Sequence, residues 1–310
     1  MLNTFSDQLF LSLEKEYSDF LESLELKLER SRFYRSFRSY REIDSLMKKE
    51  KIKIVPADKL NEYHYAVYDL TQLMEILEAV KDYPDKKILK DKIEKMNGGS
   101  PDPAEENPSN TIARDTQFEL KLYADLKNTG LDCELGEPWP DIKIITKKHT
   151  YAIECKRIFS DKASRIADRV GDARDQLMRS IDDDKNTIGL IALDITRRLT
   201  KGEMYLRAKS SELATARLSK ELDDFRKTKE FARHWRPERI GDERISAIVI
   251  YTSMYSYLED EELAAHAAQL VAQNIHGSVY GKMLFKDAVD EVLSPLSHFK
   301  TGKLDYVVEN

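Results

Sequence analysis

A short apolar segment near the middle of the chain carries two charged residues at alternating positions. The segment is Tyr151-Ala152-Ile153-Glu154-Cys155-Lys156, and a second strand-like segment that begins at Pro140-Asp141 precedes it. Because side chains alternate between the faces of a strand, Glu154 and Lys156 point the same way, and Tyr151, Ile153 and Cys155 can fill a core on the other side. A charge on a buried strand is costly unless it is paired or bound to a cation. The pattern therefore predicts a functional site at these charged residues.

Length and composition set the frame for such a site. At 310 residues the chain is expected to form one large domain or two smaller ones. Apolar residues make up 41% and charged residues 34%, and the low counts of glycine (11) and proline (9) favour helices over a turn-rich sandwich. A net charge of −6 gives no general signal for nucleic acid, although local basic patches around an acidic metal site can still bind it.

The cysteines and the N-terminal residues bear on the compartment. Only two cysteines occur, Cys133 and Cys155, which indicates a reducing compartment. The first residues lack the basic and apolar regions of a signal peptide, and no run approaches about 18 apolar residues. We therefore expect a cytoplasmic protein without contact to a membrane.

Apolar periodicity predicts helices in the first third of the chain. Residues 5 to about 50 and about 57–95 show apolar residues at three- and four-residue steps. The segment 97–110 is rich in glycine and proline and is predicted to be a linker. We expect a helical N-terminal domain over 1–96, involved in dimerisation or in contact with nucleic acid or a partner, and a second domain over 111–310.

After the linker the pattern changes to alternating helices and strands. We predict a helix over about 111–127, strands near 131–135, 141–146 and 150–156, a helix over about 164–181 and a buried strand over 187–195. A charged helical insertion is expected at about 203–233, a buried strand at 245–251, and mostly helix beyond, with Leu263, Ala267, Leu270 and Val271 as one stripe. The predicted fold class is α/β (mixed α+β): a central mixed sheet flanked by helices.

The second half of the chain resembles the PD-(D/E)xK nuclease superfamily, also called restriction-endonuclease-like. The matching residues are Pro140-Asp141, a gap of twelve residues, and Glu154-Cys155-Lys156. The common core of that family is an α-β-β-β-α-β unit, and the predicted order over about 111–195 agrees with it. The letters E-x-K also occur at Glu25 and Glu119 in stretches predicted to be helical, so the strand context distinguishes the copy at Glu154.

The resemblance implies a role for each matching residue. Asp141 and Glu154 would be metal ligands, and Lys156 would be the catalytic lysine that helps to activate water or to stabilise the phosphate. Hard oxygen ligands suit Mg²⁺, with Mn²⁺ as a substitute. Glu119, on a core-facing helical stripe, would be a third acid at the metal, and Gln176 would support the site, although the tyrosine that follows such a glutamine in some family branches is absent.

Plainer interpretations remain open for these residues. Asp141 could begin a strand after a turn that contains proline. Glu154 and Lys156 could form a solvated pair on an edge strand, worth under about 1 kcal/mol. Cys155 is interpreted as a small buried hydrophobe, and the six histidines show no zinc-ligand spacing.

Two groups of arginines are candidates for contact with nucleic acid. Residues 30–41 interleave arginines, including Arg32, Arg35 and Arg38, with aromatic residues, which predicts either phosphate contact with base stacking or an amphipathic helix with buried aromatics. Arg157 follows the motif directly, and Arg165 and Arg169 lie on the next predicted helix, where they could line a phosphate track or pair with nearby aspartates.

The leading hypothesis is a Mg²⁺-dependent endonuclease. By resemblance, DNA is the favoured substrate, a restriction or phage-defence role would fit, and a homodimer would supply two sites for a double-strand cut. A nucleic-acid-binding or scaffold protein that kept the fold without turnover and an RNA-directed nuclease are the alternatives.

Overall fold

The computed structural model describes residues 7–50, 57–100, 105–106, 110–159, 162–200, 205–228, 231, 236–258, 263–296 and 305–307. The first third is helical, as expected: α1 (Asp7–Ser23), η1 (Leu28–Arg30), α2 (Arg32–Glu50), α3 (Ala57–Val80) and α4 (Lys86–Asn97). The block expected up to residue 50 is divided, because the chain turns between α1 and η1, where Glu25 has a positive φ of 60°. Asp85 begins α4 by accepting hydrogen bonds from the backbone N–H groups of Lys87 and Ile88.

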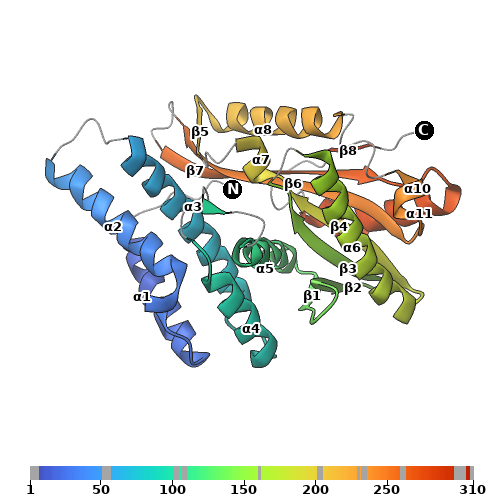
Figure 1. Ribbon diagram of the computed structural model, residues 1–310, viewed down its shortest axis with the longest axis horizontal. Coiled ribbons are helices and arrows are strands. Elements are labelled where there is room, and N and C mark those ends of the chain that lie inside the picture. Colours follow the sequence, from blue (N-terminus) through green and yellow to red (C-terminus); the bar gives the residue numbers. More distant parts are fainter. Residues whose placement is uncertain are drawn as a thin grey trace.

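A mixed eight-stranded sheet forms the second part of the molecule (Figure 1). Its order is β1-β2-β3-β4-β6-β7-β8, with β5 paired to β6. The bounds are β1 (Asp132–Leu135), β2 (Ile142–Ile145), β3 (Thr150–Arg157), β4 (Thr187–Asp194), β5 (Tyr205–Ala208), β6 (Ile245–Leu258), β7 (Leu263–Asn274) and β8 (Asp305–Val307). Strands β1 to β3 form an antiparallel meander, whereas β3, β4 and β6 run parallel, so their carboxyl ends meet at one edge.

Helices cover both faces of this sheet, as the predicted fold class requires. Helix α5 (Ile112–Asn128) packs on one face of β3 with Tyr151, Ile153 and Cys155, and α6 (Ala163–Asp183) packs on the other with Ala152. Further helices are α7 (Thr196–Thr200), α8 (Ser211–Arg226), α10 (Pro237–Ile240), α11 (Val279–Ala288) and the π-helical η3 (Val289–Leu293). Gly130, at φ 86°, follows the end of α5, where the sequence predicted a stop.

Two predicted helices are wrong in whole or in part. The segment expected to be helical from about residue 263 is strand β7, which pairs antiparallel with β6 along its whole length. Its many alanines favour helix locally, but pairing with a long neighbouring strand outweighs that weak preference. The insertion at 203–233 contains strand β5 as well as helix α8, and residues 201–204, 229–230 and 232–235 lie outside the described part.

The N-terminal helices are in contact with the α/β part. Helix α3 packs against α5, and one apolar cluster runs from Phe10 on α1 through α5 to Leu293 near the end of η3. The division into two domains at 97–110 stays a prediction. No helix in the described ranges is long and apolar enough to span a bilayer.

Candidate active site

Strand register brings Asp141 and Glu154 together. Ile142 on β2 pairs with Ile153 on β3, so the next positions outward, Asp141 and Glu154, lie opposite each other with their side chains on the same face. Asp141 precedes the first paired residue of β2, and its Oδ2 accepts a hydrogen bond of 2.8 Å from the backbone N–H of Cys155. Next to the first residue of β2, the Asp141 side chain therefore accepts the hydrogen bond that a strand backbone would otherwise accept from β3.

The turn before Asp141 is closed by a very tight contact. The backbone N–H of Gly136 donates to the carbonyl oxygen of Asp141 at 3.1 Å. A Cβ at position 136 would lie 1.7 Å from the carbonyl oxygen of Pro140, so only glycine fits there. The Trp-Pro-Asp turn thus fixes the backbone position of Asp141. Asp141 therefore has a structural role in addition to any chemical role.

Glu154 is a fully buried carboxyl group beside a second acid. Its relative exposure is 0%, and its Oε1 has no hydrogen-bond partner. Lys156 Nζ lies 3.1 Å from the other oxygen, Glu154 Oε2. Burial, and then the nearby Asp141, raise the pKa of Glu154 to about 8, against the opposing effect of Lys156. The buried surroundings of Glu154 therefore disfavour a full negative charge on it in the absence of a further cation.

The lysine responds to the same surroundings. Burial alone would lower the pKa of Lys156, but Asp141 and Glu154 outweigh it and raise that pKa. Its side chain is 11% exposed, so the ammonium group is enclosed and still accessible at one side. Asp141, Glu154 and Lys156, which the sequence predicted as one site, therefore lie together on the face of β3 that α6 covers.

Glu119 lies close to this group without joining it. It is buried on α5, which covers the opposite face of β3, and its Oε1 lies 2.5 Å from Lys92 Nζ on α4. Burial and Asp141 raise the pKa of Glu119 to about 8, while Lys92 opposes the rise. The acid on the core-facing stripe thus has an ion-pair partner that the sequence did not reveal.

Gln176 lies on the part of α6 that adjoins the Asp141 turn. Arg179, one helical turn further on, stacks its guanidinium group 4.1 Å from the ring centroid of Trp139, two residues before Asp141. Gln176 is half-buried, and its Oε1 is buried without a hydrogen-bond partner. The helix therefore places an amide with spare hydrogen-bonding capacity one turn before the arginine that contacts Trp139.

A divalent cation fits these residues in charge but not as a complete protein cage. Within the described ranges, no group of three or more Asp, Glu, His or Cys side chains is arranged to hold a metal ion. Mg²⁺ commonly takes only one or two carboxylates and keeps water or phosphate oxygens in its other positions. The adjacent Asp141 and Glu154, with the unpartnered Oε1 of Glu154, meet that smaller requirement.

The six arginines predicted to contact nucleic acid divide into three classes by exposure. Arg35, Arg38 and Arg165 are exposed, and Arg169 is half-buried. Arg32 and Arg157 are buried and form internal ion pairs. The aromatic residues Phe33, Phe37 and Tyr40 pack in the core, so the alternative of an amphipathic helix with buried aromatics describes them and base stacking does not.

A hollow of about 410 Å³ follows the end of β3 on the α6 side. Its lining includes Arg165 and Arg169, together with Asp168 and Asp172. Ile158, the position after Lys156 on the same face, also lines it. The predicted arginines of α6 and Arg157 therefore border one hollow at the end of β3, and Lys156 is not part of its lining.

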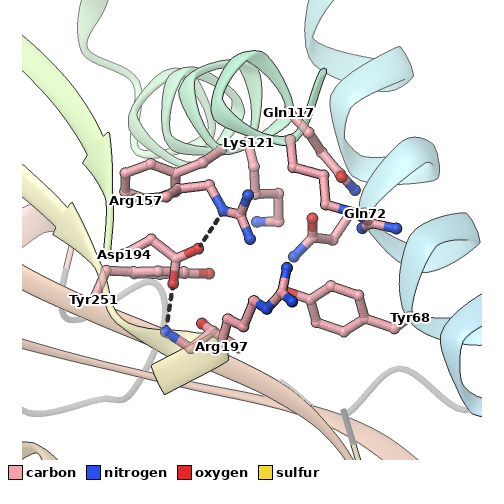
Figure 2. A pocket seen from close by; sticks show the side chains of 11 residues that line it. Tyr68, Gln72, Gln117, Lys121, Arg157, Asp194, Arg197 and Tyr251 are labelled. Atoms are coloured by element: carbon pink, nitrogen blue, oxygen red, sulfur yellow. Dashed lines mark hydrogen bonds and ion pairs between the residues drawn. The ribbon is translucent and has the colours of Figure 1, made fainter. Parts of the chain in front are cut away.

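A second polar region, of which the sequence analysis named only Arg157, lies on the opposite face of the sheet. Figure 2 shows Arg157, Arg197, Gln72 and Tyr251 around a small cavity between α3, α5 and the sheet. Arg157 donates from Nε to Asp194, its register partner on β4, at 3.2 Å. Arg157 and Asp194 meet only because β3 and β4 pair in parallel in this register. The sequence around either residue does not predict the contact.

Comparison of the chain with protein-family models, with curated proteins and with solved structures gives no match.

Proposed function

We propose that the protein is a Mg²⁺-dependent nuclease of the restriction-endonuclease-like type that hydrolyses phosphodiester bonds, most consistently in DNA. The observation that carries the proposal is the cluster of Asp141, Glu154 and Lys156 at neighbouring strand ends. The order α5-β1-β2-β3-α6-β4 supports it, because this is the order of the core of the family that the motif resembles.

Asp141 and Glu154 would hold the cation through one carboxylate each. When bound, Mg²⁺ would polarise the phosphate and lower the pKa of an attacking water. The burial of Glu154 favours this arrangement, because a buried carboxylate without enough positive charge nearby is costly and a divalent cation would remove that cost. The hydrogen bond from Cys155 N–H holds Asp141 in the orientation that faces Glu154.

Lys156 would act on the substrate rather than on the carboxylate that it now contacts. Its ammonium group pairs with Glu154 in the metal-free chain and is free to turn toward a phosphate once another cation neutralises that acid. There it would oppose the negative charge that builds on the phosphate in the transition state. Gln176 would orient a water or a phosphate oxygen through its unpartnered amide oxygen or its amide nitrogen.

The arginines at the hollow that follows the end of β3 would guide the nucleic-acid backbone. Arg165 is exposed there, and Arg169 lies 3.6 Å from Asp115 Oδ2, so Arg165 is the freer of the two for contact with phosphate. A homodimer would supply the two sites that a double-strand cut needs, and a restriction or phage-defence role belongs to the same proposal.

One observation favours a second candidate, a nucleic-acid-binding protein on the same fold without turnover. Glu119, the third predicted acid, is paired with Lys92 and would not be a metal ligand while that pair is formed. Of the two remaining acids, Glu154 is paired with Lys156. Metal dependence separates this candidate from the nuclease. An RNA substrate is separated from DNA by direct comparison.

The experiment is a cleavage assay of the full chain on plasmid, single-stranded DNA and RNA, with Mg²⁺, Mn²⁺ or EDTA. Asp141→Asn, Glu154→Gln and Lys156→Met are each expected to reduce cutting by at least about a hundredfold, since each removes a charge that the transition state uses. Asparagine is preferred to alanine at position 141 because its amide oxygen can still accept from Cys155 N–H.

A matched control is Glu134→Gln, an exposed glutamate on the adjacent strand β1, which should cut like the wild type. Cutting that survives EDTA, or full activity in all three site variants, would refute the nuclease assignment. Binding of nucleic acid without any cutting in Mg²⁺ or Mn²⁺ would support the inactive relative instead.

A further inference from the structure

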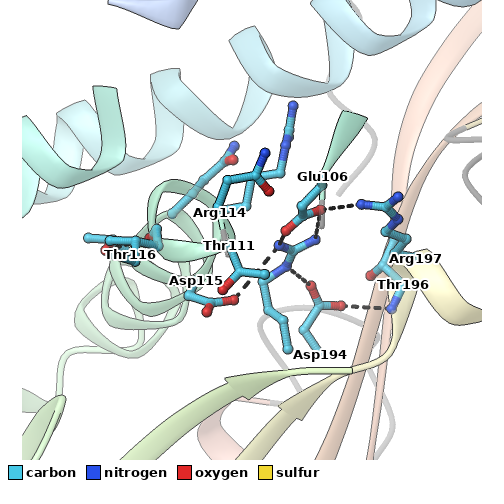
Figure 3. Close-up of polar contacts among 12 residues, drawn as sticks. Glu106, Thr111, Arg114, Asp115, Thr116, Asp194, Thr196 and Arg197 are labelled. Atoms are coloured by element: carbon cyan, nitrogen blue, oxygen red, sulfur yellow. Dashed lines mark hydrogen bonds and ion pairs between the residues drawn. The ribbon is translucent and has the colours of Figure 1, made fainter. Parts of the chain in front are cut away.

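The side chain of Glu106, from the segment that joins α4 to α5, is buried among arginines. Its side chain is 4% exposed, and Arg157 pairs with both of its oxygens. Arg197 Nη1 lies 2.7 Å from Glu106 Oε2 (Figure 3). Arg157, then Arg114 and Arg197, hold the pKa of this carboxyl below its ordinary value, against the effect of burial. Glu106 is therefore a carboxylate that is ion-paired with two guanidinium groups.

These arginines lie where α/β sheets commonly bind ligands. Arg157 is the last residue of β3, and Arg197 is in α7, immediately after β4. Since β3 and β4 run parallel, both residues lie at the carboxyl ends of adjacent strands, the usual place for a ligand site in open α/β sheets. Asp194 fixes the arrangement from the end of β4, through Arg157 Nε and the backbone N–H of Thr196.

The cavity beside the arginines is lined mainly by hydrogen-bond donors. Its lining contains four cationic side chains, Arg114, Lys121, Arg157 and Arg197, and one acid, Asp194. Tyr251, 4% exposed, also lines it, and its hydroxyl is buried without a hydrogen-bond partner (Figure 2). The cavity itself measures about 20 Å³, about the space of one water molecule.

We propose that Arg157 and Arg197 form a binding site for a phosphate group, and that Glu106 occupies this site as an internal anion which phosphate must displace. Guanidinium groups bind carboxylate and phosphate oxygens with the same two-pronged geometry, so the two anions compete for the same donors. When Glu106 leaves, the volume of its carboxylate joins the cavity, and Tyr251 Oη becomes a further donor to the larger anion.

The attachment of Glu106 to the chain sets the strength of this competition. A carboxylate that is tethered beside its site acts at a high effective concentration, so a free phosphate binds the wild-type chain weakly. Removal of its charge leaves Arg157 with Asp194 and with the more distant Asp115, which lies 3.9 Å from Arg157 Nη1. The site is separate from Asp141 and Glu154, because Arg157 lies on the opposite face of β3 from Lys156.

The test is a calorimetric titration of the metal-free full chain with inorganic phosphate, at constant ionic strength set with chloride. Glu106→Gln is expected to bind phosphate at least about tenfold more tightly than the wild type, a gain of about 1.4 kcal/mol. Glu105→Gln is the matched control, since Glu105 is exposed and precedes Glu106 directly. It should bind phosphate like the wild type.

Adding Arg197→Gln to Glu106→Gln should abolish the gain. Equal affinities of Glu106→Gln and Glu105→Gln, or tight binding that survives Arg197→Gln, would overturn the proposal. If Glu106→Gln does not fold, Arg197→Gln alone in the wild-type background gives the second readout. It should remove the weak phosphate binding of the wild type, and unchanged weak binding would contradict the site.

A parallel titration with a short single-stranded DNA in EDTA identifies the source of the phosphate. Tighter binding of the oligonucleotide than of inorganic phosphate by Glu106→Gln, lost in Arg197→Gln, assigns the site to a nucleic-acid backbone. Equal or weaker binding of the oligonucleotide assigns it to free phosphate. Because no cleavage is measured, failure of the nuclease proposal would leave this result unchanged.

Discussion

Glu154 is a buried carboxyl group whose protonation should govern how the protein responds to pH. In the fold its pKa is about 8, against an ordinary value of 4.5. The folded chain therefore holds this proton more strongly than the unfolded chain does. The resulting stabilisation is complete below about pH 4.5 and is lost as the pH rises toward 8.

The predicted consequence is a difference between Glu154→Gln and the wild type that grows with pH. Glutamine stays neutral, so the melting temperature of Glu154→Gln in EDTA should fall less between pH 5 and pH 8 than that of the wild type. Part of the slope should remain, because Glu119 has a similarly raised pKa. Differential scanning calorimetry at several pH values measures this, with Glu134→Gln as the control. Parallel curves for Glu154→Gln and the wild type would show that Glu154 keeps an ordinary pKa.

At the scale of elements, the sequence predicts most helices and strands, and the strand that it took for a helix has an identifiable cause. The strand expected over 150–156 is β3, and alternation correctly placed Tyr151, Ile153 and Cys155 in the core. Strand β7 was missed because its alanines carry a helix preference, while the partner that makes it a strand, β6, lies earlier in the chain. Local sequence patterns therefore predict an element correctly when its own residues determine whether it is a helix or a strand. They fail when pairing with another strand determines it.

The N-terminal helices are joined to α5 by buried charges as well as by apolar contacts. Asp69 on α3 accepts from Arg32 on α2 at 2.7 Å and from Arg114 on α5 at 3.0 Å, and all three residues are buried. Burial outweighs the attraction of Asp69 and lowers the pKa of Arg32 to about 10. The fold therefore depends on Asp69 to compensate two buried guanidinium groups.

Asp69→Asn is expected to destabilise the protein by about 3–5 kcal/mol, because it leaves buried charges without their partner. The control is Glu25→Gln, which breaks the exposed ion pair with Lys90 and should change stability little. Urea unfolding followed by circular dichroism measures both. A loss in Asp69→Asn no larger than in Glu25→Gln would show that the charged contact between α3 and α5 contributes little.

At the scale of the whole molecule, strand register brings together charged residues that lie on different segments of the sequence. Asp141 meets Glu154 through the antiparallel pairing of β2 with β3, and Arg157 meets Asp194 through the parallel pairing of β3 with β4. The sequence predicted that Glu154 and Lys156 share a face, since two positions on one strand suffice for that. It could not place Lys92 beside Glu119 or Glu106 beside Arg197, because those pairs join segments far apart in the chain.

The binding of a divalent cation to the full chain tests the acidic site most directly. Calorimetric titration with Mn²⁺ at pH 8 should show one site in the wild type and in Glu134→Gln. Glu154→Gln and Asp141→Asn should each weaken the binding by at least about tenfold, since each removes one of the two carboxylates. A wild-type chain that binds no cation, or a Glu154→Gln chain that binds it as tightly as the wild type, would contradict a metal site formed by Asp141 and Glu154.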